Sequence, residues 1–265
     1  MTTAMGAPAP RGEMIDIGGR KLRMVCIGPP GASPLVVFEA GAFGFSADWA
    51  VVQEDLAGQG VRSCAYDRAG LGYSDPGPAP RDGIAVAEDL EALLKASGET
   101  GPYILVGHSM AGTRIRLFYG RNRDKVVGLV YVDAAPAAQI AAPDAQRLLG
   151  PFTTVSKLAG VAATLDLLKP LAFMGDTIGL PPDAAAEKRW AFADARHNRS
   201  SAGEVVLWTK AAEQAVATGP IEPTAPARSP RAAWSKRWRS RTGSMASRPS
   251  PSIRASSSPT WPTRR

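Results

Sequence analysis

The chain has 265 residues, of which 45% are hydrophobic, and a formal net charge of +7. This length suits one α/β domain with an insertion, and this hydrophobic content can build a sizeable core. Residues 221–265 hold ten Lys or Arg against one acid, so the tail carries +9 and residues 1–220 carry −2. The overall charge therefore excludes little about the partners of the folded part.

Composition also bears on location. No run reaches the roughly 18 apolar residues of a membrane span, and the N-terminal residues lack the charged and apolar regions of a signal peptide. We therefore expect a soluble, cytoplasmic protein. Cys26 and Cys64 lie in apolar, strand-like runs with neither zinc-like spacing nor a disulfide framework, so we expect two buried, reduced thiols.

The first half of the chain alternates strands with helices. Two runs around a Gly-Gly turn predict an opening hairpin, at 13–17 and 21–27. Continuous apolar runs predict buried strands at 34–39, 61–66, 103–106 and 126–132, and helical periodicity predicts helices at 46–57, from Asp82 to Gly98, and after residue 109. This order predicts an α/β fold with a mostly parallel sheet and flanking helices.

The second half changes in character. Residues 136–217 are rich in Ala and Leu and are interrupted by prolines, which predicts a helical lid inserted over the sheet. After Gly219 no apolar period persists, and we expect residues 221–265 to be a basic, disordered tail. We therefore divide the chain into a core at 12–135, a lid at 136–217 and a tail at 221–265.

The most informative segment is YILVGHSMAG, residues 103–112. It runs from an apolar strand through a turn of small residues into a helix, which is the setting in which a serine hydroxyl becomes a nucleophile. Gly107, Ala111 and Gly112 are small enough for strand and helix to approach closely, although Ala111 stands where Gly is usual. We interpret Ser109 as a nucleophile, against the alternative of an ordinary serine in a turn.

Two further motifs follow neighbouring strands. FEAGAFG, residues 38–44, follows one strand where a backbone N–H could join that of Met110 to bind the oxyanion of a tetrahedral intermediate. DRAGLGYSD, residues 67–75, follows the next strand. These three motifs occur in the order found in serine hydrolases, so residues 12–217 resemble the α/β-hydrolase superfamily, in particular a bacterial, esterase- and lipase-like subgroup.

The resemblance implies roles for several residues. Ser109 would be the nucleophile, and the N–H groups of Ala42 and Met110 would form the oxyanion hole. The 67–75 loop would brace the sheet without a catalytic role. Asp133 follows the strand after the nucleophile, where a minority of the family keeps the triad acid; most of the family places it one strand later, which favours a loop carboxylate that caps the next segment.

The base that the family requires is a histidine near the C-terminus, beyond strands that this chain is expected to lack. Only His108 and His197 are present. His108 should point away from the neighbouring hydroxyl, as a wall residue or a hydrogen-bond donor to the site. His197 lies in a polar stretch of the lid, where we expect surface exposure, with a displaced base as the alternative.

The tail offers an explanation for the missing base. In a shifted reading frame, the codons allowed at 233–239 and 259–263 could encode a helix and a histidine-bearing loop such as those that end the family. We hypothesise a frameshift near residues 221–228 that replaced the last strands, the usual acid and the base. The rival is a nucleic-acid-binding extension, in which Trp234, Trp238 and Trp261 would stack on bases and arginines would neutralise phosphates.

The function expected from the resemblance is hydrolysis of a carboxylic ester through an acyl-enzyme on Ser109, with little activity left in this chain. No cofactor, metal, membrane or nucleic acid is expected, the partner is a small-molecule ester, and the oligomeric state stays open. The alternative is a non-catalytic binding protein. Apolar lid residues are candidates for an acyl pocket or for plain core: Leu148, Leu149, Leu165, Leu167, Leu168 and Phe173.

Overall fold

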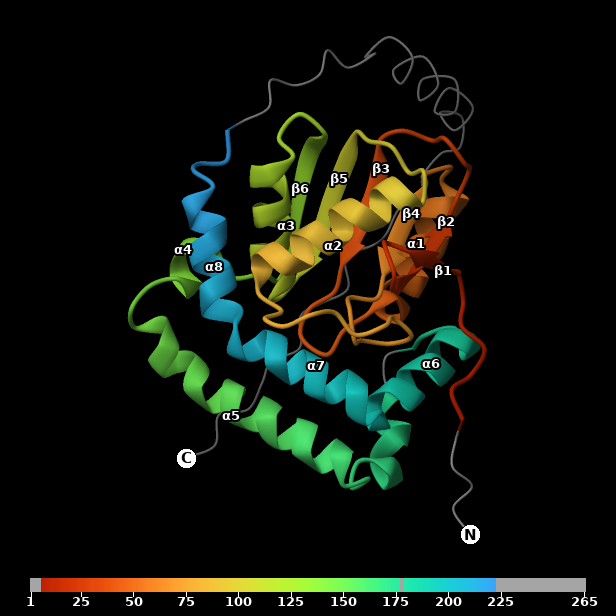
Figure 1. The fold of residues 1–265 in the computed structure, drawn as a ribbon. Helices are drawn as coiled ribbons and strands as arrows, with labels where there is room; N and C mark the ends of the chain where they lie inside the picture. Colours follow the sequence, from red (N-terminus) through yellow and green to blue (C-terminus); the bar gives the residue numbers. More distant parts are fainter. Residues whose placement is uncertain (1–5, 177–178, 223–265) are drawn as a thin grey trace, which may run out of the picture. The chain divides into compact units, whose positions relative to one another are not determined.

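The computed structural model of the chain describes residues 6–176 and 179–222 (Figure 1). The tail, with its frameshift and nucleic-acid interpretations, lies outside these residues from position 223 onward. Within them, no helix combines the length and the apolar character needed to cross a bilayer.

A six-stranded sheet forms the centre of the fold, in the order β1-β2-β4-β3-β5-β6. The strands are β1 (Glu13–Asp16), β2 (Lys21–Ile27), β3 (Leu35–Glu39), β4 (Ser63–Tyr66), β5 (Tyr103–His108) and β6 (Val126–Val132). The hairpin β1–β2 pairs antiparallel with β4, whereas β3 to β6 run parallel to one another. The prediction of a mostly parallel sheet is confirmed.

Helices cover both faces of this sheet, as the alternating pattern predicts. On one face α2 (Gly83–Ala96) and α3 (Ala111–Arg121) bury Leu93 and Phe118 against Leu105 of β5. On the other face, the 3₁₀ turn η1 (Ser46–Trp49) and α1 (Ala50–Gly58) pack Trp49 against Phe38 of β3. Because both faces of the central strands β3 and β5 are covered, their sequences are largely apolar.

The remaining helices follow β6, and α5, α6 and α7 lie together below the sheet in Figure 1. They are α4 (Ala137–Ile140), α5 (Ala145–Thr164), the 3₁₀ segment η2 (Lys169–Asp176), α6 (Pro182–Ala193), α7 (Ala195–Val206) and α8 (Trp208–Ala217). Helix α5 packs along α7, whereas α8 packs against α2, α3 and α4. The last helix of the segment that the sequence assigns to the lid therefore lies on the helices of the core.

β6 forms one edge of the sheet. It pairs with β5, and no other strand of the described residues pairs with its outer edge. Its apolar side chains are unusually open to solvent for a parallel strand, with Val130 45% and Tyr131 41% exposed. This is the open edge expected if further strands of the family's sheet are missing.

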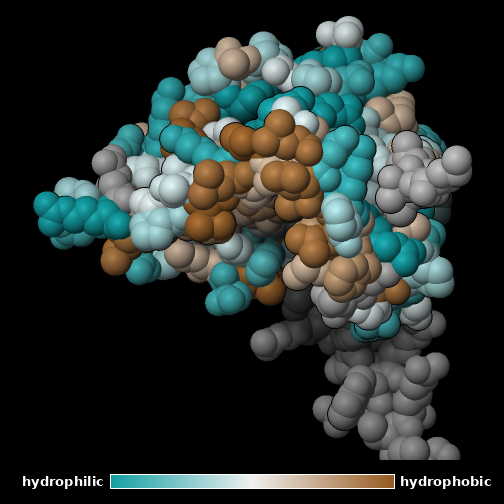
Figure 2. All heavy atoms as spheres, turned by 90° about the horizontal axis from the view of Figure 1, so that it is seen from below, coloured by the Kyte–Doolittle hydropathy of each residue, from teal (hydrophilic) through white to brown (hydrophobic). Residues whose placement is uncertain are grey.

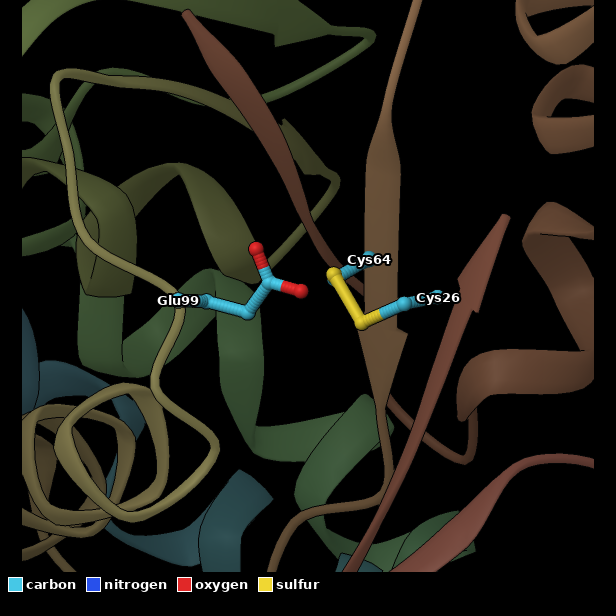
Figure 3. Close-up of side chains that lie close together, drawn as sticks. All are labelled: Cys26, Cys64 and Glu99. Carbon is cyan, nitrogen blue, oxygen red and sulfur yellow. A yellow bond between two sulfur atoms is a disulfide. The ribbon is translucent and has the colours of Figure 1, made fainter. Parts of the chain in front are cut away.

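The expectation of two reduced thiols is wrong, because Cys26 and Cys64 form a disulfide (Figure 3). They lie opposite each other in the antiparallel register of β2 and β4, with their Cα atoms 4.1 Å apart. The strand register creates this proximity, which a separation of 38 residues conceals in the sequence. Glu99 lies beside the sulfurs in Figure 3, but its carboxylate accepts hydrogen bonds from Arg62, so these three groups form no set of free metal ligands.

Candidate active site

The turns that carry the motifs lie together at the carboxyl ends of the parallel strands. β3, β4, β5 and β6 are parallel, so the turns that follow them leave the sheet on the same side. Those turns hold the 40–44 segment, the 67–75 loop, Ser109 and Asp133. The topology thus brings together motifs that are far apart in the sequence.

Ser109 occupies a sharp turn between β5 and α3. Its φ is +54°, in the left-handed region that a residue with a side chain rarely adopts, at a cost of about 1–3 kcal/mol. A Cβ on Gly107 would lie 3.0 Å from the carbonyl oxygen of Ala111, and one on Gly112 would lie 2.8 Å from Cβ of Ala134. These distances explain why small residues flank the serine.

The turn that follows β3 lies directly against Ser109. A Cβ on Gly41 would lie 3.2 Å from Cβ of Ser109 and 3.1 Å from Nδ1 of His108, so glycine suits this close approach and a larger residue would require the neighbours to shift. We call residues 40–44 the oxyanion turn, after the role expected for them.

Arg68 fixes the orientation of the oxyanion turn. Its guanidinium donates to the carbonyl oxygens of Ala40, at 2.8 Å, and Gly41, at 2.9 Å. Because C=O and N–H of a trans peptide point in opposite directions, the N–H of Ala42 points away from Arg68. Neither this N–H nor that of Met110 donates a hydrogen bond to another residue of the described chain.

Arg68 is itself held by buried carboxylates. Its Nη1 donates to Oε1 of Glu39 at 2.9 Å, and its Nε donates to Oε2 of Glu204 on α7 at 2.8 Å. Burial disfavours the charged guanidinium, but these two carboxylates outweigh it and raise the pKa of Arg68 above its ordinary value. Arg114 of α3 donates to the same Glu204 oxygen at 2.8 Å. The cluster ties strand β3, helix α3 and helix α7 to the oxyanion turn.

His197 is buried, with 2% of its surface exposed, so the expectation of surface exposure is wrong. The N–H of Gly72 donates to its Nδ1 at 2.9 Å, which places the proton on Nε2, 3.1 Å from the carbonyl oxygen of Phe43. Burial, reinforced by the charge of Lys188, lowers the pKa of His197 to about 3. Both ring nitrogens bind backbone groups, and this leaves none to accept a proton from Ser109.

One face of α7 makes most of these contacts. His197, Ser201 and Glu204 follow one another at spacings of four and three residues, which places them on the same side of the helix. Oγ of Ser201 accepts a hydrogen bond from the N–H of Phe43 at 2.7 Å. The roles of Arg68 and Ser201 were not predicted from the sequence, and His197 was misplaced, although the recurrence of His197, Ser201 and Glu204 at helical spacing was a visible signal.

The structure does not assemble a triad around Ser109. His108 and Asp133 are exposed, and Asp133 has a φ of +43° in the turn after β6. Among the described residues, the hydroxyl of Ser109, the ring of His108 and the carboxylate of Asp133 have no hydrogen-bond partner. The turn that holds Ser109 contacts the oxyanion turn, but the carboxylate of the candidate acid Asp133 forms no hydrogen bond with either turn.

Comparison with known proteins agrees with this geometry. A family model described as "alpha/beta hydrolase fold" matches residues 34–211. The chain belongs to this family. Membership confirms the resemblance to the α/β-hydrolase superfamily inferred from the three motifs.

Individual relatives match only parts of the chain or only its fold. A protein of Hormonema carpetanum named "Probable transporter efuK" is 40% identical over 130 residues, which cover 46% of this chain and 18% of that relative. The Cif epoxide hydrolase of Acinetobacter nosocomialis is similar with a TM-score of 0.60, 18% identity and coverage of 77% of this chain and 67% of that one. A thermophilic esterase of Thermogutta terrifontis, solved with malate bound, gives a TM-score of 0.54, 21% identity and coverage of 76% and 73%. These structures share the fold.

Proposed function

We propose that the chain is a serine hydrolase of carboxylic esters by ancestry, which keeps the acyl-accepting part of its site and lacks the general base. The observation that carries this proposal is the contact between the two turns, with the left-handed Ser109 so close to Gly41 that an added Cβ there would lie 3.2 Å from Cβ of Ser109. An aspartate at position 109 would favour the epoxide hydrolases and dehalogenases, so the serine favours acyl transfer.

The proposed reaction begins when Oγ of Ser109 attacks the acyl carbon of the ester. The carbonyl oxygen then becomes an oxyanion, which the N–H groups of Ala42 and Met110 stabilise. Expulsion of the alcohol leaves an acyl-enzyme, and water attacks the acyl carbon to release the acid. Two backbone donors that bind no other described residue suit this task.

Proton transfer is the step that this chain performs poorly. The chain has two histidines, and both nitrogens of His197 are engaged with the backbone. Without a histidine to orient, Asp133 has no step of its own in the proposed reaction. Loss of the base alone costs about 10⁶ in kcat, roughly 8 kcal/mol of transition-state stabilisation. We therefore expect slow acylation of Ser109 and almost no turnover.

Labelling with a fluorophosphonate probe tests the proposal. The full chain should be labelled slowly at one site, which peptide mapping assigns to Ser109. The Ser109→Ala variant should not be labelled, whereas Ser97→Ala, a control at another partly exposed serine, should match the parent chain. Labelling that persists in Ser109→Ala would refute the assignment of the nucleophile.

A second candidate function is non-catalytic binding by a hydrolase-like scaffold, which the engagement of His197 favours. In that case, a non-hydrolysable ester analogue should bind with heat detectable by calorimetry, while Ser109 resists the probe. This candidate is selected over the first if the ligand binds while the probe labels Ser109 no faster than it labels the other serines of the chain.

A further inference from the structure

Helix α5 exposes most of its large apolar side chains and buries several small ones. Ser156, Gly160 and Ala163 are buried, and a Cβ on Gly160 would lie 3.5 Å from Cα of Arg199 on α7. The large apolar residues face away from α7, with exposed fractions of 79% for Leu148, 63% for Val155, 62% for Leu158 and 63% for Leu165. Figure 2 looks at the molecule from the side on which α5 lies in Figure 1, and hydrophobic side chains gather at the centre of that face.

This arrangement is the reverse of a surface helix in a soluble protein, which turns its apolar stripe toward the core. It also corrects the expectation that Leu148, Leu165, Leu167 and Phe173 form an acyl pocket or core, because all four are exposed. The exposed stripe has regular spacing of three and four residues, which is typical of a helix that packs along another helix. We call it the α5 seam, and its positions are the exposed Leu148, Pro151, Val155 and Leu158, the half-buried Ala162, and the exposed Leu165 at the C-cap of the helix.

We propose that the α5 seam packs against the α5 seam of a second copy of this chain, with the two helices antiparallel. A two-fold axis between Ser156 and Lys157 matches every seam position with another seam position of the second copy. The three pairs are Leu148 with Leu165, Pro151 with Ala162, and Val155 with Leu158. Such self-complementarity is what a two-fold interface between identical chains requires.

The charges at the two ends of the seam favour the antiparallel arrangement. Asp144 and Arg147 are exposed at the N-terminal end, and Asp166 and Lys169, which form an ion pair with each other at 2.8 Å, are exposed just beyond the C-terminal end. Each end carries one acidic and one basic side chain, and the antiparallel arrangement sets Arg147 of one copy toward the end that carries Asp166 in the second copy. A parallel pair would place identical charges at the same height.

The size of the surface fits a helix pair with flanking contacts. α5 has 20 residues and is therefore about 30 Å long. Stable interfaces bury about 1,600 Å² in total, more than one short helix pair supplies. The next segment adds further exposed apolar side chains, Leu167, Leu171 and Phe173.

Sedimentation equilibrium of the full chain tests the proposal. The parent chain should form dimers. Val155→Glu should raise the dimer dissociation constant about 100-fold, because the two-fold interface then buries two carboxylates and each raises that constant about tenfold. Val52→Glu places the same substitution at a 42% exposed valine of α1, outside the seam, and should leave the dimer unchanged. Circular dichroism confirms that each variant folds, and Leu148→Glu serves as a second seam variant.

Two results would overturn the proposal. One is a parent chain that stays monomeric at every concentration up to its solubility limit. The other is a dimer that survives both seam variants, which would assign self-association to another face or to residues 223–265. If the full chain sediments on lipid vesicles in a way that the seam variants abolish, while remaining monomeric, a lipid surface replaces the second copy as the occupant.

Cysteine cross-linking tests the orientation. The chain's two cysteines are bonded to each other, so an added cysteine is the only free thiol. A mixture of Leu148→Cys and Leu165→Cys chains should oxidise to a linked dimer that contains one of each. Linked dimers formed by Leu148→Cys alone, at the same rate, would contradict the antiparallel arrangement.

Discussion

Replacing His197 by glutamine should flatten the dependence of stability on pH. In the folded chain His197 is neutral and buried, and its pKa is lowered to about 3. In the unfolded chain a histidine titrates near pH 6.5. Below that pH the unfolded state therefore binds a proton that the folded state refuses, and the free energy of unfolding falls as the pH decreases from about 6.5 toward 3.

The size of the effect follows from these two pKa values. Between about pH 7 and about pH 5, this one histidine should remove about 2 kcal/mol from the free energy of unfolding. Glutamine does not titrate, and its amide can still donate to the carbonyl oxygen of Phe43. The variant should be less stable near pH 7, because the acceptor for the N–H of Gly72 is lost, but its stability should vary less with pH.

Urea unfolding followed by tryptophan fluorescence, at several pH values, measures this difference. The exposed His108 provides the matched control, so His108→Gln should keep the pH dependence of the parent chain. Equal pH dependence in the parent chain and in His197→Gln would mean that His197 titrates normally in the folded state. That result would refute its burial between the two loops and would restore it as a candidate base.

Other substitutions test the supports of the site and the sheet. Arg68→Met should cost about 3–5 kcal/mol, measured by urea unfolding, because it leaves buried carboxylates without their cation, and it should also slow labelling of Ser109. Gly72→Ala should destabilise the 67–75 loop, because φ is +50° and the new Cβ would lie 2.1 Å from Oδ2 of Asp67; a thermal midpoint equal to that of the parent chain would contradict this geometry. Joint replacement of Cys26 and Cys64 by alanine should cost about 2–4 kcal/mol, and a reducing agent should then have no further effect.

The sequence predicted the features that depend on local pattern and burial. Continuous apolar runs at 34–39 and 126–132 identified strands β3 and β6. For β3 the reason is coverage on both faces, which leaves little room for polar residues. The small residues around Ser109 identified the strand-to-helix turn, because larger ones would collide there. These patterns were sufficient for the fold, whereas the roles of Ala42 and Met110 followed only from the family resemblance.

Features that depend on distant partners could not be predicted. His197 is buried by Phe43 and Gly72, which are 154 and 125 residues away. The sequence of a polar helix does not reveal whether such distant partners cover it or whether it faces solvent. The disulfide depends on the register of β2 and β4. For α5, periodicity identifies an apolar stripe but not which way it faces, since that depends on which side α7 packs against.

The central claim is that Ser109 accepts acyl groups in a chain without a general base, and hydrolysis of p-nitrophenyl acetate tests it most directly. The account predicts release of at most about one equivalent of p-nitrophenol per chain above the rate of Ser109→Ala, with one acetyl group recovered on Ser109 by mass spectrometry. Sustained turnover that disappears in Ser109→Ala, and also in His108→Gln or His197→Gln, would contradict the account, because it would show that a working base is present.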